Sequence, residues 1–444
     1  MADNRSARAV VDSVCDSFAD LPAPPDEPST VDGPIGWPGY DAAHAGAAER
    51  TGERESVLCG TATFGGVRAV VIAFEFGFLG GSIGGRTGAL LESGFGYARQ
   101  NRLPVVSLVA TGGSRMQEGM RALTQLQRVA RQLALHRSAG LAHVSVLRDP
   151  STGGGWATLG AGADVTLALP GAQVGFAGSR VRPPGDDLAY TAESQRDTGQ
   201  VDEVVDGADL AAALLRWLRV LAGPRLDEAP LPEALGGTEP AQTGWEAVLA
   251  ARAPARPRAD SYVDAYVSGR VVISGDRCGG VDPGVLCGFG VRDGGAVAFA
   301  AQRGTATEPA GFRTLARLVR LADRLGIPVL TIVDTPGAAN DGAAERAGAG
   351  AAIAGLFEVI ASAAVPVTTL VIGEGGSGGA LALATPGRTW VTPDGYFTVT
   401  SPEAAAAILK RETDEVPAIA DRLRLRPADL LELGVVNGIV GGPR

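Results

Sequence analysis

Four glycine-rich turns are the parts of this chain whose residue types and spacing could support chemistry. Each follows a run of aliphatic residues, and the turns are Thr111-Gly112-Gly113, Ser151–Gly155, Thr335-Pro336-Gly337 and Gly375–Gly379. A strand that ends in glycines where a helix begins leaves backbone N–H groups without partners, with the positive end of the helix dipole behind them. Such amides stabilise negative charge on an oxygen. The turns therefore predict oxyanion holes built from the backbone.

The turns are arranged as two matched pairs. Residues 104–113 read PVVSLVATGG and residues 328–337 read PVLTIVDTPG, an offset of 224 residues. The second turn of each pair repeats at Gly153-Gly154 and Gly378-Gly379, an offset of 225. One isolated Gly-Gly pair usually means a tight turn or close packing. Four turns in matched order indicate two similar domains.

Other glycine motifs fit poorly. GGSIGGRTG lacks the spacing of a dinucleotide fingerprint, and GEGGSGG lacks the Lys-Ser/Thr pair of a phosphate loop. Ser377 formally matches the G-x-S-x-G nucleophile elbow, but no histidine follows it as a base. Nucleotide-binding and Ser-His hydrolase classes are therefore disfavoured.

The elements that must position the turns read as repeated strand, glycine turn and helix units, typical of an α/β fold. VLCGTATFGGVRAVVIAFEF predicts a hairpin through Gly65-Gly66. Composition divides the chain into a partly helical, loosely packed lead-in (1–55), a first domain (56–222), a Pro- and Ala-rich linker (223–260) and a second domain (261–444).

Charge and composition narrow the partners. The net charge is −10 and no basic run occurs, which argues against nucleic acid. The four cysteines and three histidines show no metal-ligand spacing, so we predict no metal. No apolar run reaches the roughly 18 residues of a membrane helix and the N-terminus lacks a signal-peptide pattern. A cytoplasmic protein without membrane contact is expected.

Longer motifs carry a family resemblance. GFLGGSIGG, ATGGSRMQEGMRALTQLQR, HVSVLRDPSTGGGWATLGAGAD and VGFAGSRV resemble the carboxyltransferase β subunit of bacterial acetyl-CoA carboxylase. GFRTLARLVRLADRLGIPVLTIVDTPGA, AVPVTTLVIGEGGSGGALALAT and YFTVTSPEAAAAILKR resemble its α subunit. The resemblance covers about residues 56–222 and 262–441. It implies two tandem crotonase-like (ClpP/crotonase superfamily) ββα-superhelix domains.

The resemblance implies transfer of a carboxyl group from carboxybiotin to the α-carbon of a short acyl-CoA, with acetyl-CoA to malonyl-CoA as the default. The first pair of turns would hold the thioester oxygen and the second pair the ureido oxygen of biotin. The backbone groups assigned to catalysis are those of Gly153, Gly154, Gly378 and Gly379. The residues assigned to substrate binding are Gly112, Gly113, Ser114, Arg115, Gly178, Gly337, Gly375, Gly376 and Ala380. For Arg115, an ion pair at a helix start is the alternative.

The single lysine, Lys410, does not lie in the Met-Lys-Met setting of a biotinylated lysine. The resemblance therefore implies biotin on a separate biotin carboxyl carrier protein, charged by a separate biotin carboxylase. Family geometry also implies an active site shared between subunits, hence a homodimer or higher homo-oligomer. Decarboxylation of a malonyl-type thioester and a catalytically degenerate scaffold subunit remain alternative interpretations.

Some residues depart from the family pattern. The four-cysteine zinc ribbon of the β subunit is missing, and Ala338–Gly342 lacks the usual tyrosine and proline. Trp156 replaces a small residue beside the first hole, where it either restricts acyl size or packs in the core. A Gly379→Val variant is expected to abolish transfer by blocking the second hole while leaving the fold largely intact.

Overall fold

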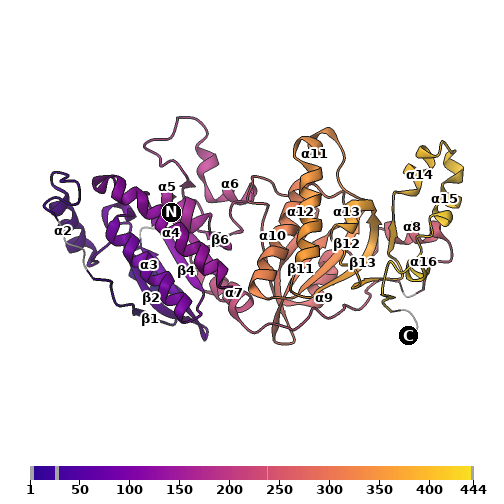
Figure 1. The fold of residues 1–444 in the computed structure, drawn as a ribbon, viewed down its shortest axis with the longest axis horizontal. Coiled ribbons are helices and arrows are strands. Elements are labelled where there is room, and N and C mark those ends of the chain that lie inside the picture. Colours follow the sequence, from indigo (N-terminus) through magenta and orange to yellow (C-terminus); the bar gives the residue numbers. More distant parts are fainter. Residues whose placement is uncertain (1–4, 26–29, 238, 442–444) are drawn as a thin grey trace. The chain divides into compact units, whose positions relative to one another are not determined.

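Two β-sheets with the same strand order organise the chain (Figure 1). The computed structural model describes residues 5–25, 30–237 and 239–441. The chain divides into two units, Met1–Gly223 and Pro224–Arg444, and each contains one eight-stranded sheet. The order is β1-β2-β3-β4-β5-β6-β8 in the first unit and β9-β10-β11-β12-β13-β14-β16 in the second, with β7 beside β5 and β15 beside β13. The predicted duplication of an α/β domain is confirmed.

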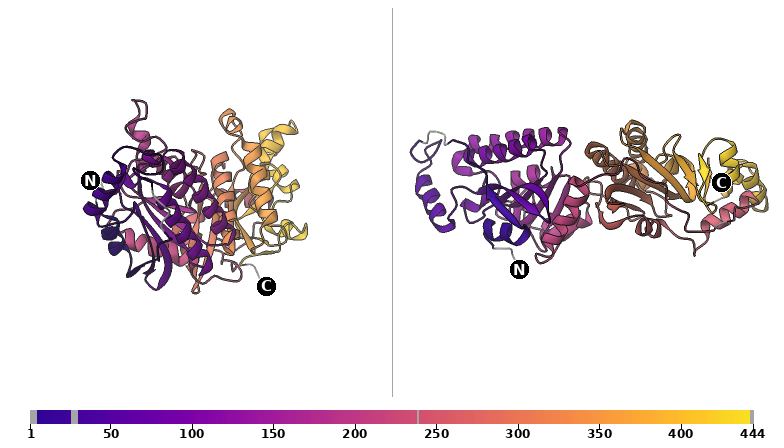
Figure 2. Two further views of the ribbon diagram at one scale, coloured as in Figure 1. Left: turned by 60° about the vertical axis from the view of Figure 1, so that its left-hand side comes forward. Right: turned by 90° about the horizontal axis from the view of Figure 1, so that it is seen from below.

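The strands of the first unit are β1 (Ser17–Asp20), β2 (Val57–Phe64), β3 (Val67–Phe74), β4 (Val105–Thr111), β5 (His143–Thr152), β6 (Val165–Ala168), β7 (Val174–Gly175) and β8 (Glu203–Val204). Its helices are α1 (Ala7–Val14), α2 (Tyr40–Thr51), α3 (Gly85–Gln100), α4 (Met120–Ser138), α5 (Gly153–Gly155), α6 (Ala192–Asp197) and α7 (Leu210–Ala222). Helices α3 and α4 cover one face of the sheet, and α1 and α7 pack on the other (Figure 2). Both faces are covered, so the central strand β4 consists of buried residues throughout.

The strands of the second unit are β9 (Ser268–Val272), β10 (Val285–Arg292), β11 (Gly295–Gln302), β12 (Val329–Thr335), β13 (Val367–Gly376), β14 (Thr389–Val391), β15 (Tyr396–Thr398) and β16 (Gly438–Ile439). Its helices are α8 (Gly244–Arg252), α9 (Ala259–Tyr266), α10 (Pro309–Leu325), α11 (Gly342–Arg346), α12 (Ala349–Ser362), α13 (Ser377–Leu381), α14 (Pro402–Ile408), α15 (Val416–Arg422) and α16 (Pro427–Glu432). Helices α10 and α12 pack together, and α9 packs on β10 and β11.

Both units begin their parallel core with an antiparallel hairpin. In the first unit, β2 and β3 pair from Val57 to Phe74 and turn through Gly65 and Gly66. Both glycines have positive φ, 52° and 88°, which side chains adopt at a steric cost. The hairpin predicted there is confirmed, and β10 and β11 form its counterpart.

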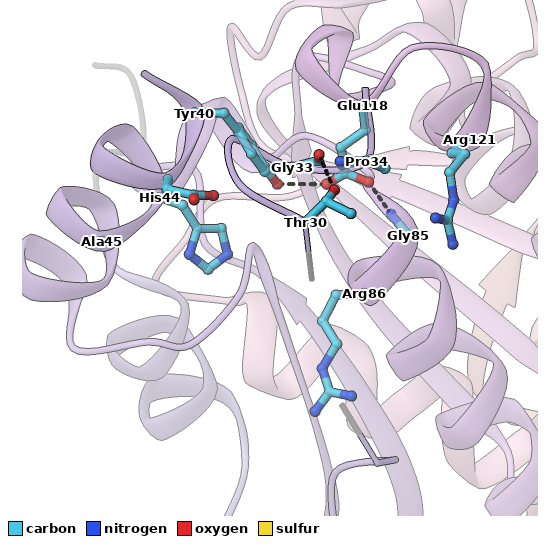
Figure 3. Close-up of a pocket in the computed structure, with 11 residues that line it drawn as sticks. Thr30, Gly33, Pro34, Tyr40, His44, Ala45, Gly85, Arg86, Glu118 and Arg121 are labelled. Atoms are coloured by element: carbon cyan, nitrogen blue, oxygen red, sulfur yellow. Dashed lines mark hydrogen bonds between the residues drawn. The ribbon is translucent and has the colours of Figure 1, made fainter. Parts of the chain in front are cut away.

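The N-terminal segment packs more tightly than the sequence predicted. Its helix α1 buries Ala7, Val10, Val11 and Val14, the spacing of an amphipathic helix, and β1 pairs with β2. Helix α2 places the Tyr40 hydroxyl 2.7 Å from the Glu118 carboxylate. Both residues line a cavity of about 450 Å³ (Figure 3). The expectation of a loosely packed lead-in fails for α1, because its Ala- and Val-rich stripe docks on the first unit, whereas most described residues between α1 and α2 are exposed or half-buried.

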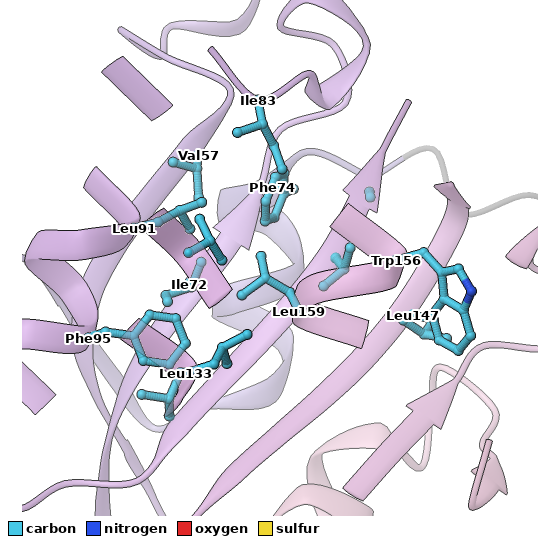
Figure 4. Close-up of a cluster of buried hydrophobic side chains, with 14 of the residues drawn as sticks. Val57, Ile72, Phe74, Ile83, Leu91, Phe95, Leu133, Leu147, Trp156 and Leu159 are labelled. Atoms are coloured by element: carbon cyan, nitrogen blue, oxygen red, sulfur yellow. The ribbon is translucent and has the colours of Figure 1, made fainter. Parts of the chain in front are cut away.

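Trp156 lies in the hydrophobic core of the first unit. Its indole is 8% exposed and belongs to the hydrophobic cluster with Leu147 and Leu159 (Figure 4). A Cβ placed at Gly160 would lie 2.4 Å from the indole ring, so the ring fills the space that this glycine leaves. Core packing, one of the two readings of Trp156, is the one that the structure shows.

Within the segment 223–260, which composition indicated as a linker, the structure places helix α8 against the second unit. Ala247, Val248 and Ala251 of this helix are buried with Tyr396 and Leu425. No described helix is both long and apolar enough to cross a membrane.

Candidate active site

The first turn of each pair is held by a threonine. In the first unit the Thr111 hydroxyl accepts the amide of Gly113 at 3.0 Å, and in the second the Thr335 hydroxyl accepts that of Gly337 at 3.1 Å. Gly113 and Gly337 have φ values of 103° and 141°, which favour glycine at both positions. The turns are thus built alike, 224 residues apart.

A neighbouring loop completes each first turn. The amide of Ile83 donates to the Gly113 carbonyl at 2.8 Å, and the amide of Arg115 donates to the Ile83 carbonyl at 2.9 Å. In the second unit, Thr307 and Ala339 make the same two bonds around Gly337, at 3.0 and 2.9 Å. Because the backbone of each turn is bonded on both sides, its remaining amides point in a fixed direction.

The second turns are equivalent at an offset of 224, one residue less than the glycine pairs suggested. Thr111 pairs with Ser151 and Thr335 pairs with Gly375. The following left-handed residues are Gly153, with φ of 63°, and Ser377, with φ of 54°. The predicted offset of 225 was therefore wrong. The sequence comparison aligned one Gly-Gly pair with the other, whereas the backbone conformation aligns Gly153 with Ser377.

This shift changes which amides are available. The Gly153 amide donates to the Phe176 carbonyl at 3.1 Å, and the Gly112 amide donates to the Gly80 carbonyl at 2.9 Å. Both are therefore engaged, as are those of Gly113 and Gly337. Among the described residues, matching amides of the two units have no backbone acceptor outside their own helix: Ser114, Gly154 and Gly155 in the first, Ala338, Gly378 and Gly379 in the second. The four glycines lie in the first turns of α5 and α13, where amides have no partner within the helix.

The two turns of each pair touch. A Cβ placed at Gly153 would lie 3.0 Å from the Cα of Gly113, and one placed at Gly379 would lie 2.4 Å from the amide nitrogen of Ala338. Any side chain at Gly379 therefore meets backbone, so Gly379→Val must at least shift the two turns against each other. That the fold stays largely intact remains a prediction. At Gly378, by contrast, no atom lies within 4 Å of such a Cβ.

A buried glutamine ties the second pair together. The Gln302 side-chain amide donates to the carbonyl of Gly379 and to the Thr307 hydroxyl, both at 3.1 Å. Gln302 is completely buried at the end of β11. One carboxamide thus joins the second turn to Thr307, whose backbone amide bonds to Gly337 of the first turn, and this link restrains the distance between the two turns.

A cavity of about 750 Å³ opens beside the first pair of turns. It lies where β3, β4 and β5 end, a usual position for ligand sites in such sheets. Its lining includes three residues predicted to bind substrate, Gly112, Ser114 and Gly178. Asp149 and Arg180 bring one charge of each sign to the wall. Exposed apolar side chains, Met116 and Val181 among them, form another part of it.

Arg115 lies outside this cavity and is buried behind the turn. Its guanidinium contacts Glu55 at 2.5 and 2.6 Å and Glu118 at 3.0 Å, and it also donates to the Ser82 carbonyl. Burial alone would raise the pKa of the Glu55 carboxyl, but the hydrogen bonds from Arg115 and the nearby His44 imidazole outweigh it and lower that pKa to about 2. The structure therefore places the Arg115 guanidinium in a buried ion pair, outside the lining of the cavity.

The remaining predicted residues support the second turn. Gly375 and Gly376 are paired with Phe397 and Thr398 of β15, so they belong to the sheet. Ala380 is fully buried in α13 and faces the core. The sequence missed Gly155 and Ala338, which offer free amides. A strict offset of 224 would have found both, because it maps them onto Gly379 and Ser114.

Family models match both halves of the chain. Residues 240–444 match a family described as acetyl co-enzyme A carboxylase carboxyltransferase-like, and residues 38–200 match the carboxyl transferase domain.

Full-length relatives agree with these matches. The chain is 40% identical over 428 residues to the acetyl-coenzyme A carboxylase carboxyl transferase subunits beta/alpha of Saccharopolyspora erythraea, covering 91% of this chain and 74% of that one. It is 34% identical over 413 residues to a probable biotin-dependent acyl-coenzyme A carboxylase beta3 subunit of Mycobacterium bovis, covering 89% and 82%.

Among solved structures, transcarboxylase 12S with methylmalonyl-coenzyme A and methylmalonic acid bound superposes with a TM-score of 0.79 at 19% identity. The match covers 98% of this chain and 86% of that one. At this identity the likeness shows the shared fold.

Proposed function

The chain belongs to the carboxyltransferase subunits of acyl-CoA carboxylases, with a β-like half joined to an α-like half, and from this premise we propose its reaction. It transfers a carboxyl group from carboxybiotin to the α-carbon of a short acyl-CoA, with acetyl-CoA giving malonyl-CoA as the default. The carrying observation is the matched set of unpaired amides in the two units. Two oxygens gain negative charge in this reaction, and one set serves each.

In the first unit, the amides of Ser114, Gly154 and Gly155 would bind the thioester oxygen. Loss of the α-proton converts the thioester into an enolate whose charge lies on that oxygen. Preorganised amides stabilise the charge more in the transition state than in the ground state, and each donor contributes about 3 to 4 kcal/mol. The enolate carbon then attacks CO₂ and forms the new C–C bond.

In the second unit, the amides of Ala338, Gly378 and Gly379 would hold the ureido oxygen of biotin. The open space beside Gly378 fits a group that approaches the backbone closely. When bound, carboxybiotin supplies the CO₂ and, on its freed ureido nitrogen, the base for the α-proton. The chain's part is to orient that group and stabilise its oxygen, so it needs no side-chain base.

The cavity of the first unit would take the acyl-CoA. Its volume of about 750 Å³ suits a thioester with part of its pantetheine arm. The apolar wall would contact the arm, and the exposed Arg180 would face the negative charge of the coenzyme.

The partners follow from the same proposal. Lys410 is exposed after α14, and biotin would be carried by a separate biotin carboxyl carrier protein that a biotin carboxylase charges. The active site would combine the first unit of one chain with the second unit of another, in a homodimer or larger homo-oligomer. Sedimentation of the active enzyme as a monomer would contradict this arrangement. The cytoplasmic location remains a prediction.

The test is the reverse reaction. Purified chain is mixed with malonyl-CoA and biocytin, and acetyl-CoA is measured with and without biocytin. We expect release that depends on biocytin. Release without biocytin would indicate a decarboxylase using the same amides, and no turnover would indicate a scaffold subunit. Methylmalonyl-CoA in place of malonyl-CoA tests the acyl-chain preference.

A further inference from the structure

A buried ion pair lies directly behind the second pair of turns. Asp334, the residue before Thr335, is completely buried at the end of β12. Both of its carboxylate oxygens accept from one guanidinium nitrogen of Arg256, at 2.9 and 3.0 Å. Arg256 comes from the segment between α8 and α9, which composition alone indicated as a linker.

The pair connects the two strands that carry the turns. Besides Asp334 on β12, Arg256 donates to the Ile372 carbonyl of β13 at 3.0 Å. Asp334 in turn accepts the Glu374 amide of β13 at 3.2 Å and a nitrogen of Arg258 at 3.1 Å. These contacts lie where the β12–β13 register shifts, between Val333 and Thr335. The ladder is interrupted there, so the ion pair replaces missing backbone bonds.

Gly373 makes room for the pair. A Cβ at this position would lie 2.3 Å from a carboxylate oxygen of Asp334 and 2.4 Å from a guanidinium nitrogen of Arg256. Its φ is not in the left-handed region, so backbone conformation does not require glycine here. The space for the ion pair is what excludes a side chain.

The fold itself does not require this device. At the same offset the first unit has Ala110 in place of Asp334 and Asp149 in place of Gly373. Its strands β4 and β5 show the same register shift, and the buried guanidinium there, that of Arg148 on β5, donates to the carbonyls of Phe74 and Arg5. The ion pair is therefore a feature of the second unit's turns.

We propose that Arg256 is a positioning residue for the second oxyanion hole. It fixes the ends of β12 and β13 so that the amides of Ala338, Gly378 and Gly379 converge on one oxygen. This inference rests on the proposed function. An oxyanion hole acts only when its donors are held within hydrogen-bond distance of the developing charge, so a small displacement of one turn is costly.

The test compares Arg256→Lys with Arg426→Lys in the full-length chain. Lysine keeps the charge but cannot bridge Asp334 and Ile372 with a planar fork. Arg426 makes a bidentate contact with Asp429 on α16 and donates to the Gln242 carbonyl rather than to a turn, so it serves as the matched control. We expect Arg256→Lys to lower kcat for biocytin carboxylation at least about tenfold with the Kd for malonyl-CoA unchanged. The control should keep both values.

A second readout does not depend on turnover. Hydrogen–deuterium exchange of the segment 374–380 should rise in Arg256→Lys and stay unchanged in Arg426→Lys. If Arg256→Lys does not fold, Gly373→Ala separates the same pair without altering charge and should show the same two effects. Wild-type kcat together with unchanged exchange in either folded variant overturns the proposal. A wild-type chain without transfer contradicts the proposed function, and exchange then still decides the role of Arg256.

Discussion

The two units hold equivalent glycine turns with different residues. In the first, Arg115 follows the turn in the chain and pairs with Glu55 from the N-terminal segment and with Glu118. In the second, the arginine comes from the segment before the sheet and pairs with Asp334 of the strand. The amides keep their positions while the supporting side chains change. A site made of backbone amides needs side chains that hold its turns in place, and the two units use two different ion pairs for this.

The units also differ in their titratable groups. All three histidines, His44, His136 and His143, lie in the first unit. His143 is buried with its Nε2 2.8 Å from the Ser107 hydroxyl, and its backbone amide donates to the Asp164 carboxylate. Burial, followed by the nearby charges of His136 and Arg137, lowers the pKa of its imidazole to about 3. A fall in pH should therefore destabilise the first unit more than the second.

The largest expected effect comes from Arg115→Met. The change leaves the buried carboxylates of Glu55 and Glu118 without their cation, and such a loss costs about 3 to 5 kcal/mol of unfolding free energy. Chemical denaturation monitored by hydrogen exchange should show the loss of unfolding free energy in the first unit and not in the second. Arg196→Met removes an exposed ion pair with Asp197 and should cost less than about 1 kcal/mol. Equal costs for the two variants would contradict the support assigned to Arg115.

The next effect concerns the second hole. In Gly379→Ala the new Cβ is forced against the Ala338 amide, so the two turns must separate. We expect carboxyl transfer to biocytin to fall at least about 100-fold, the size of one lost oxyanion donor. Gly350→Ala on α12 places its Cβ in open space and serves as the control. Equal activity of the two alanine variants would exclude this turn from the site.

A moderate effect is expected on acidification. The unfolded imidazole binds a proton near pH 6.5, whereas His143 in the folded chain stays neutral down to about pH 3. Its contribution is therefore complete above pH 6.5 and is lost as the pH falls, by about 2 kcal/mol at pH 5. Hydrogen exchange at pH 7 and pH 5, corrected for intrinsic rates, should show weaker protection in the first unit. In His143→Gln the difference between the units should shrink.

The smallest effect should come from Arg180→Gln. The exposed guanidinium lines the first cavity and would attract the charged coenzyme through solvent, an interaction worth less than about 1 kcal/mol. Steady-state kinetics should show a KM for malonyl-CoA raised a few-fold, with the KM for biocytin unchanged. Added salt should remove most of this difference. A change confined to the KM for biocytin would show that the cavity does not bind the acyl-CoA.

Much of the architecture was accessible from the sequence. The repeat at 224, the hairpin through Gly65-Gly66 and the order of strand, turn and helix all reflect local patterns, and the structure confirms them. The site was accessible in part. Gly112, Ser114 and Gly178 do line the cavity of the first unit, but Gly153 does not offer its amide and Arg115 is buried in an ion pair. In the second unit, Ala380 is fully buried. The sequence shows where the glycines are, but only the hydrogen bonds of the folded chain show which backbone amides remain without an acceptor.

The sequence by itself determined that this chain is a duplicated carboxyltransferase with a backbone-built site in each half. Periodicity, turn residues and motif order are local properties, so they can be read along the chain. Tertiary structure alone decided which amides stay unpaired and which charges support them. Arg115 reaches Glu55 across 60 residues and Arg256 reaches Asp334 across 78. Such partners meet only when strands and segments distant in sequence pack together, because burial and hydrogen-bond geometry act in space.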